Sequence, residues 1–220
     1  MSPGLFNMRV KSQPGEVEGS VEESRPGMVA ILGSPRRGGN SDTLAAEFLK
    51  GAASAGLAAK VIIPTDLALA PCDGKNRCFA DGNCMIADGM DAIYDEVLAA
   101  RRLVVATPVY FMGPPGSLKS FIDRFQAVWA RSEILHTFDP ASPDRRRDHK
   151  AFAIFTCGVK NDPGAYRPAV SIVKAFANVT GFDYAGELIA TGLEHVDDAS
   201  RRDDLLRQAF AAGLAFAEGT

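Results

Sequence analysis

An apolar segment that stops abruptly at a glycine-rich, cationic segment constrains this chain more than any other feature. Residues 28–32 read Met-Val-Ala-Ile-Leu, and residues 33–41 read Gly-Ser-Pro-Arg-Arg-Gly-Gly-Asn-Ser. A short apolar run bounded by turn-forming residues is typical of a buried β-strand. After the polar segment, Leu44, Phe48 and Leu49 recur at helical spacing. We therefore predict a strand, a loop and a helix, in that order.

The predicted loop and helix together favour an anion. Asp42 suits the N-cap or first turn of the helix, and Gly51 and Gly56 would fray its far end. Backbone N–H groups and the positive end of the helix dipole attract negative charge at such a start. Gly38 and Gly39 let the backbone approach an oxyanion closely. The candidate phosphate-binding residues are Ser34, Arg36, Asn40, Ser41 and Thr43, with Arg37 as an alternative source of charge.

Two common phosphate motifs do not account for this loop. A Walker A loop needs a lysine where Asn40 stands, and the G-x-G-x-x-G spacing of dinucleotide-binding loops is also missing. A polar surface loop after a core strand remains the alternative to an anion-binding loop.

Residues 33–41 resemble the FMN-phosphate loop of the flavodoxin-like NAD(P)H-dependent FMN reductase superfamily. The resemblance covers most of the chain from Met28 onward and is strongest to the branch that contains the iron–sulfur flavoproteins. It implies an α/β fold of the flavodoxin-like, doubly wound type, with a five-stranded parallel sheet in three α/β/α layers. It also implies FMN as the cofactor and NAD(P)H as the reductant.

A second rigid segment follows the apolar run at residues 103–107. Residues 107–116 contain three prolines and two glycines, and they hold Tyr110 and Phe111 at the carboxyl end of a predicted strand. A flat ring could bind there, although an ordinary turn whose aromatic side chains cover the core is the alternative. The candidate cofactor-binding residues in this segment are Pro108, Val109, Tyr110, Phe111, Met112 and Gly113.

Five strand-like runs separated by helical patterns predict a doubly wound α/β sheet. The strands are expected at residues 28–32, 59–63, 103–107, 151–156 and 184–190, and the later helices at 90–98, 118–129, 170–181 and 205–216. Ligands bind such sheets outside the carboxyl ends of the strands, at the topological switch point. This rule brings residues 34–43, 108–113 and 156–160 together. It adds Thr156, Cys157 and Gly158 as candidate cofactor-binding residues. Lys119, Asp123 and Arg124 match a mainly structural stretch of the superfamily, so we assign them no chemistry.

Three of the four cysteines lie in a polar loop at residues 71–88. Cys72, Cys78 and Cys84 are separated by five residues each. The iron–sulfur flavoproteins have a motif that resembles Cys-x2-Cys-x2-Cys followed by a fourth cysteine, and Lys75 occupies the second of these positions here. A [4Fe–4S] cluster normally takes four thiolates. We therefore expect no metal centre, with these three cysteines as the candidate ligands if a three-iron cluster or an oxygen-ligated cluster forms.

The same three thiols could instead pack the loop against the flavin or a subunit contact. Zinc would also want a fourth ligand. None of His136, His149 and His195 lies near the cysteines in the sequence.

Two segments are expected to pack little against the core: residues 1–26, which precede the domain of residues 27–220, and residues 132–150 within that domain. Residues 1–26 are rich in proline, glycine and glutamate, which predicts a flexible arm. Alternatively, the arm contacts a neighbouring subunit through Leu5, Phe6, Met8 and Val10. Residues 132–150 predict a solvated connection, although the basic run at 145–150 could instead attract the phosphates of NAD(P)H.

Charge and hydropathy exclude several classes of partner. The net charge of −3 and the pI of about 5.7 give no global attraction to nucleic acid or to an anionic membrane. No apolar stretch has the length of a membrane span, and the first residues lack the apolar core of a signal peptide. We therefore expect a cytoplasmic protein. The family resemblance, together with the aromatic segment at Tyr110 and Phe111, implies a homodimer or homotetramer that uses a small-molecule electron acceptor.

The family resemblance, together with the three predicted ligand loops, implies an FMN-dependent oxidoreductase. It would transfer a hydride from NAD(P)H to the flavin and pass electrons to a quinone, a flavin or another small acceptor. The flavin carries the chemistry in such enzymes, so no catalytic side chain is expected. An electron carrier fed by ferredoxin and a non-enzymatic flavin-binding sensor are the alternatives.

Overall fold

The computed structural model describes residues 27–219. Residues 1–26, for which an arm is expected, and Thr220 lie outside the described part. The strands are β1 (Met28–Leu32), β2 (Ala59–Ile62), β3 (Arg102–Pro108), β4 (Lys150–Cys157) and β5 (Asp183–Thr191). The helices are α1 (Asn40–Ser54), α2 (Met90–Ala99), α3 (Gly116–Arg124), α4 (Gln126–Glu133), α5 (Pro143–Asp148), α6 (Pro163–Val179) and α7 (Asp203–Glu218). Short 3-10 turns stand at Pro64–Asp66, Arg77–Phe79 and Ala199–Arg201.

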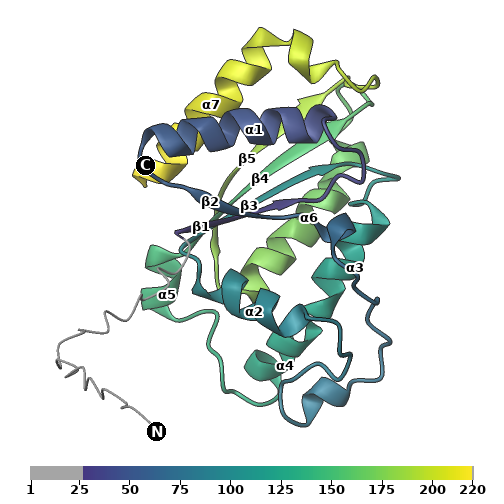
Figure 1. Cartoon of the computed structure of the whole chain (residues 1–220), viewed down its shortest axis with the longest axis vertical. Coiled ribbons are helices and arrows are strands. Elements are labelled where there is room, and N and C mark those ends of the chain that lie inside the picture. The colour runs from purple at the N-terminus through teal and green to yellow at the C-terminus, as the bar shows by residue number, and fades with distance from the viewer. Residues whose placement is uncertain (1–26, 220) are drawn as a thin grey trace, which may run out of the picture.

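The five strands form one parallel sheet in the order β2-β1-β3-β4-β5 (Figure 1). Met28 pairs with Ala59 on one side and with Arg102 on the other, so β1 is the strand from which the chain winds both ways. This is the strand order of flavodoxin-like folds, in which the switch point lies between β1 and β3. The predicted fold class is confirmed.

Alternate residues of β1 face the two helical layers, as the pleat of a strand requires. Met28 and Ala30 pack with α1 and α7, whereas Val29 and Ile31 pack with α2, α3, α4 and α6. Figure 1 shows these two sets of helices on opposite faces of the sheet. The central strands are buried on both faces, which explains their continuous apolar runs.

The α1 and α7 helices approach so closely that glycine is required at their contact. A Cβ atom on Gly51 would lie 2.0 Å from the carbonyl oxygen of Phe210, and one on Gly213 would lie 1.9 Å from that of Phe48. The prediction that Gly51 frays the helix is therefore wrong, because Gly51 is a packing residue inside α1. The helix ends at Ser54, before Gly56.

The structure differs from the sequence prediction in two further places. The single helix expected at 118–129 is divided at Phe125 into α3 and α4. The connection at 132–150 contains α5, and its Arg145 donates hydrogen bonds to the carbonyl oxygens of Leu98 (2.9 Å) and Thr180 (3.0 Å). This basic run is thus partly packed rather than fully solvated.

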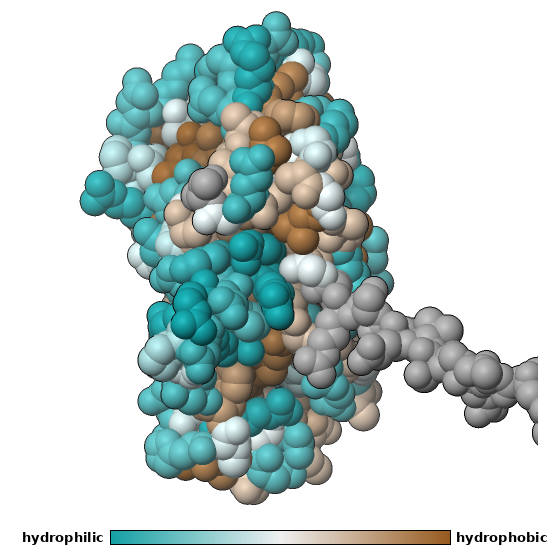
Figure 2. Space-filling model, turned by 90° about the vertical axis from the view of Figure 1, so that its left-hand side faces the viewer, coloured by the Kyte–Doolittle hydropathy of each residue, from teal (hydrophilic) through white to brown (hydrophobic). Residues whose placement is uncertain are grey.

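The basic run lies at the amino edge of the sheet. The α5 helix leads directly into Lys150, the first residue of β4, whereas the predicted ligand loops follow the carboxyl ends of the strands. Figure 2 shows strongly hydrophilic side chains gathered on this face, where Arg101, Arg102 and Arg147 border a cavity of about 300 Å³. Residues 145–150 therefore lie at the edge of the sheet opposite to the predicted ligand loops of the same chain. Among residues 27–219, no helix is long and apolar enough to cross a membrane.

Candidate functional site

The loops after β1, β3 and β4 converge on one cavity of about 290 Å³ at the carboxyl edge of the sheet. The expected residues that line it are Ser34, Arg36, Asn40, Ser41, Pro108, Val109, Tyr110, Thr156 and Gly158. Gly39, Leu193 and Glu194 also line it. The cavity therefore stands at the switch point that the strand order defines.

The N-terminus of α1 opens into this cavity. Asn40 is the first helical residue and Gly39 is the N-cap, and no side chain of the described residues caps this end. The first N–H groups of a helix have no intrahelical acceptor, so they and the helix dipole favour an anion. Arg36 lines the same wall and adds a positive charge. This arrangement fits a terminal phosphate group.

The hydroxyl of Ser34 shapes the anion-binding loop from within. It donates to the carbonyl oxygen of Arg36 (2.9 Å) and accepts from the N–H of Arg36 (3.1 Å). The hydroxyls of Ser41 and Thr156 lie 2.7 Å apart, and both residues are buried. This second pair connects the first turn of α1 to the end of β4.

Asp42 lies in the first turn of α1, as one of the two sequence alternatives predicts. Its carboxylate accepts a hydrogen bond from the N–H of Gly38 (2.9 Å) and pairs with Arg37 (3.4 Å). Burial raises the pKa of Asp42, and the Gly38 N–H and Arg37 partly offset that shift. Arg37 also donates to the carbonyl oxygen of Ser34, so it braces the loop while Arg36 faces the cavity.

The side chain of Asn40 binds another segment of the protein. Its amide nitrogen donates to the carbonyl oxygens of His195 (2.8 Å) and Leu193 (3.5 Å), and its amide oxygen accepts from the N–H of Ala199 (2.9 Å). The expectation that this side chain donates to a phosphate is therefore not met in this structure, because the donor is already used. Asn40 borders the cavity but holds the segment after β5 against α1.

The aromatic segment after β3 forms a two-residue turn. The N–H of Tyr110 donates to the carbonyl oxygen of Gly113 (2.8 Å), and the N–H of Gly113 donates back to that of Tyr110 (3.0 Å). Phe111 and Met112 between them have φ angles of +46° and +67°. Positive φ at both central residues is the signature of a type I′ turn, which non-glycine residues adopt at an energetic cost. The turn projects a fully exposed Phe111 beyond the cavity.

Five of the expected residues do not line the cavity. Phe111 and Met112 point into solvent at the tip of the turn, and Gly113 closes it. Thr43 lies further along α1, where its N–H bonds to the carbonyl oxygen of Gly39. Cys157 is buried, and since it follows Thr156 in β4 its side chain projects from the opposite face of the sheet.

Sequence reasoning missed the wall formed by Leu193 and Glu194. Both residues follow β5, and the N–H of Leu193 bonds to the carbonyl oxygen of Cys157 (3.0 Å). Only their position after a predicted strand could have indicated these residues, because the carboxyl ends of all strands in a parallel sheet lie at the same edge. Residues 192–195 carry no motif that would single them out.

The cysteine loop is held by a buried arginine. Arg124 donates to both carboxylate oxygens of Asp88, to the carbonyl oxygens of Ala70 and Ile86, and to the sulfur of Cys84 (3.3 Å). Burial and the neighbouring cysteines raise the pKa of the Cys78 thiol. Within residues 27–219, no group of three or more His, Cys, Asp or Glu side chains is arranged to hold a metal ion. With Lys75 in place of a cysteine, this loop supplies three of the four thiolates that a [4Fe–4S] cluster normally takes.

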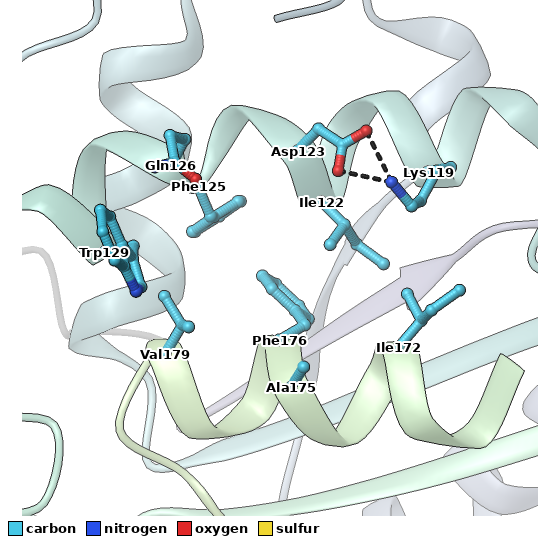
Figure 3. Close-up of a pocket in the computed structure, with 10 residues that line it drawn as sticks. All are labelled: Lys119, Ile122, Asp123, Phe125, Gln126, Trp129, Ile172, Ala175, Phe176 and Val179. Atoms are coloured by element: carbon cyan, nitrogen blue, oxygen red, sulfur yellow. Dashed lines mark hydrogen bonds and ion pairs between the residues drawn. The ribbon is translucent and has the colours of Figure 1, made fainter. Parts of the chain in front are cut away.

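A separate apolar groove lies between the α3–α4 pair and α6 (Figure 3). Its volume is about 270 Å³, and Ile122, Trp129 and Ile172 are among its lining residues. Its charged side chains are Lys119 and Asp123, which pair with each other across a 2.7 Å contact. This groove offers no unpaired charge for a phosphate.

The sequence resembles known flavoproteins along much of its length. Over 97 residues it is 37% identical to an iron–sulfur flavoprotein of Methanocaldococcus jannaschii, an alignment that covers 44% of this chain and 50% of that protein. The chain spans about half the length of the iron–sulfur flavoproteins it matches. Over 190 residues it is 27% identical to YwqN of Bacillus subtilis, whose name describes an NAD(P)H-dependent FMN-containing oxidoreductase. That alignment covers 86% of this chain and 93% of YwqN.

Solved structures share the fold. An FMN-dependent NADH-azoreductase of Bacillus anthracis superposes with a TM-score of 0.62 at 16% identity, covering 86% of this chain and 99% of that one. The profile of the NADPH-dependent FMN reductase family matches residues 26–178. Because this match takes in well over half of the sequence, the chain belongs to the NADPH-dependent FMN reductase family.

Proposed function

We propose that this protein is an FMN-dependent oxidoreductase that takes a hydride from NAD(P)H and passes electrons to a small acceptor such as a quinone or a flavin. The observation that carries the proposal is the cavity at the switch point, where the start of α1 and Arg36 meet the rigid segment Pro108–Tyr110. The family description supports FMN as the flavin.

The cavity offers different chemistry to the different parts of FMN. The N–H groups at the start of α1 and the guanidinium of Arg36 would hold the terminal phosphate. Residues 108–110 would contact the ring, because they line the cavity. Their position is fixed by a hydrogen bond from the Val109 N–H to the carbonyl oxygen of Thr156 (2.8 Å) at the end of β4. Thr156 and Gly158 would border the chain between phosphate and ring. FMN, when bound, supplies the capacity to accept a hydride and release electrons.

The protein's own contribution is binding and orientation. The ionisable side chains that line the cavity are those of Arg36, Tyr110 and Glu194. Tyr110 is exposed and belongs to the turn at the cavity mouth. We therefore propose that it acts by shape and stacking rather than as an acid or base.

The test is flavin binding with a phosphate-specific variant. Purified protein should be yellow and should release FMN on denaturation, while release of FAD or failure to bind any flavin would contradict the proposal. Arg36→Gln should weaken FMN binding about tenfold or more, because a charge-assisted hydrogen bond to phosphate is lost. Riboflavin, which lacks the phosphate, should bind the variant and the wild type alike. Arg207→Gln, an exposed arginine of α7, is the matched control.

An electron carrier fed by ferredoxin is the second candidate function. The identity to iron–sulfur flavoproteins favours it, whereas the three-cysteine loop does not. Anaerobic rapid mixing separates the two candidates. Direct bleaching of the flavin by NADPH or NADH supports the oxidoreductase, and bleaching only by reduced ferredoxin, with stoichiometric iron in the protein, supports the carrier.

We further propose that the protein is cytoplasmic and forms a homodimer or homotetramer. The exposed apolar side chains of Phe111 and Met112 and the apolar groove beside α6 support self-association, since a second copy would remove apolar surface from water. Light scattering at micromolar concentration distinguishes these assemblies from a monomer.

A further inference from the structure

Glu194 places a carboxylate in the wall of the candidate flavin cavity. It makes no hydrogen bond and no ion pair to any residue of the range 27–219, and its side chain is exposed. The lining of the cavity therefore carries the unpaired negative charge of Glu194 as well as the positive charge of Arg36.

The backbone on both sides of Glu194 is fixed. Leu193 before it is buried and bonds through its N–H to the carbonyl oxygen of Cys157. The carbonyl oxygen of His195, which follows Glu194, accepts a hydrogen bond from the side-chain amide of Asn40 (2.8 Å). The backbone N–H of His195 donates to the carboxylate of Asp198 (2.7 Å). These bonds hold residue 194 at one place on the cavity wall.

The end of β4 leaves space for the Glu194 side chain. A Cβ atom on Gly158 would lie only 3.2 Å from the Cγ atom of Glu194. The Glu194 side chain thus packs over Gly158, itself a lining residue of the cavity. The segment after β4 and the segment after β5 therefore fit together, because the absence of a side chain at Gly158 leaves room for that of Glu194.

The chemistry of this wall is selective. An ionised carboxylate only accepts hydrogen bonds, so it favours ligand hydroxyl groups. It also repels a further phosphate beside the one that Arg36 and the start of α1 attract, because Leu193 and His195 are both hydrogen-bonded to Asn40, the first residue of α1. A flavin with one terminal phosphate and free ribityl hydroxyls satisfies both requirements, and the pyrophosphate of FAD does not.

We propose that Glu194 is a specificity-determining residue that selects FMN over FAD, and that Asn40 is the positioning residue that holds it. The proposal rests on the proposed function, because it assumes that the cavity binds a flavin. Asn40 acts through the backbone of residues 193–199, to which its side chain makes three hydrogen bonds.

The experiment measures dissociation constants of FMN and FAD for the flavin-free full-length protein, from the quenching of flavin fluorescence. Glu194→Gln keeps the size of the side chain and an acceptor oxygen but removes the charge. The ratio of the FAD to the FMN dissociation constant should fall about tenfold, as expected when one close charge repulsion is removed. Glu218→Gln makes the same change in an exposed glutamate at the opposite edge of the sheet and should leave the ratio unchanged.

The positioning role has its own readout. Asn40→Ser should also lower the ratio of the FAD to the FMN dissociation constant. The double variant Asn40→Ser/Glu194→Gln should have the same ratio as Glu194→Gln alone, because both changes remove the effect of the same carboxylate. An effect of Asn40→Ser on stability alone, with the ratio intact, overturns the positioning role. An unchanged ratio in Glu194→Gln with flavin still bound overturns the proposal while leaving the proposed function standing. If the wild-type protein binds no flavin at all, both fail.

Discussion

Arg124→Met is expected to destabilise the protein and release the cysteine loop. The Arg124 side chain is 0% exposed and that of Asp88 is 10% exposed, so their ion pair is almost completely removed from water. The guanidinium also holds the carbonyl oxygens of Ala70 and Ile86, at the two ends of the loop. Methionine fills a similar volume but offers no donor.

The expected loss follows from what remains after the change. Removing one partner of a buried ion pair typically costs about 3–5 kcal/mol, because the other charge is left without compensation. The carbonyl oxygens of Ala70 and Ile86 lose a donor as well, at about 1 kcal/mol each where water does not replace it. Because Asp88 retains slight contact with water, and water can replace the donor at the exposed Ala70 and the half-exposed Ile86, we expect a total of about 4 kcal/mol. For a domain of this size, that lowers the melting temperature by roughly 8–16 °C.

Urea denaturation measures the loss, with Arg207→Met on the exposed face of α7 as the matched control. The double variant Asp88→Asn/Arg124→Met should recover part of the stability, since no unpaired charge remains. Limited digestion with trypsin should cut faster after Lys75 and Arg77 in the released loop. A loss below about 1 kcal/mol, close to that of an ordinary surface change, would refute the reasoning.

The ion pair between Arg124 and Asp88 also makes a pH-dependent contribution to the stability of the protein. The hydrogen bonds from Arg124 lower the pKa of Asp88 below its usual value of about 3.9. A lowered folded-state pKa stabilises the protein above the unfolded value, and this stabilisation is lost as the pH falls through the folded value. The stability of the wild type should therefore drop below about pH 4 more steeply than that of Asp88→Asn. Parallel curves would contradict this assignment.

Two further predictions concern the backbone. Gly213→Ala should destabilise the protein by about 3 kcal/mol or more in urea denaturation, because its Cβ would lie 1.9 Å from a carbonyl oxygen of α1. Gly116→Ala, which meets no atom within 4 Å, should change stability by less than about 1 kcal/mol, and equal losses would contradict the packing argument. The double change Phe111→Asn/Met112→Gly should raise the free energy of unfolding by about 1 kcal/mol, because both residues now have positive φ. A decrease would show that the two apolar side chains stabilise the fold in the assembled protein.

The strands and long helices could be predicted because their apolar residues form continuous runs in buried strands and recur every three to four positions in helices. The central run of β3 is apolar without interruption, as a strand covered on both faces requires. The division at Phe125 could not be predicted, since Phe125 and Trp129 keep helical spacing across it. The α5 helix was missed for a different reason. It packs through Arg145, a half-buried side chain that donates hydrogen bonds to the carbonyl oxygens of Leu98 and Thr180, and a hydrophobic pattern does not register an arginine.

The location of the candidate site could be predicted from the sequence, but the contacts of its side chains could not. The chain itself places residues 34–41 after β1 and residues 108–110 after β3, so the topology of a parallel sheet is enough to bring them together. The role of Asn40 depends on partners more than 150 positions away in the sequence. No local pattern contains that information, and the same holds for the wall at Glu194.

The polar side chains of the phosphate-type loop mostly shape it. Ser34 bonds within the loop, Ser41 bonds to Thr156, and Asn40 bonds to the segment after β5. What remains free to meet a ligand is the set of N–H groups at the start of α1, the guanidinium of Arg36 and the carboxylate of Glu194. Recognition would then depend on backbone groups whose positions the side chains determine. It follows that substitutions at Ser34 or Ser41 would alter affinity by moving the backbone, whereas those at Arg36 or Glu194 would alter the charge that the ligand meets.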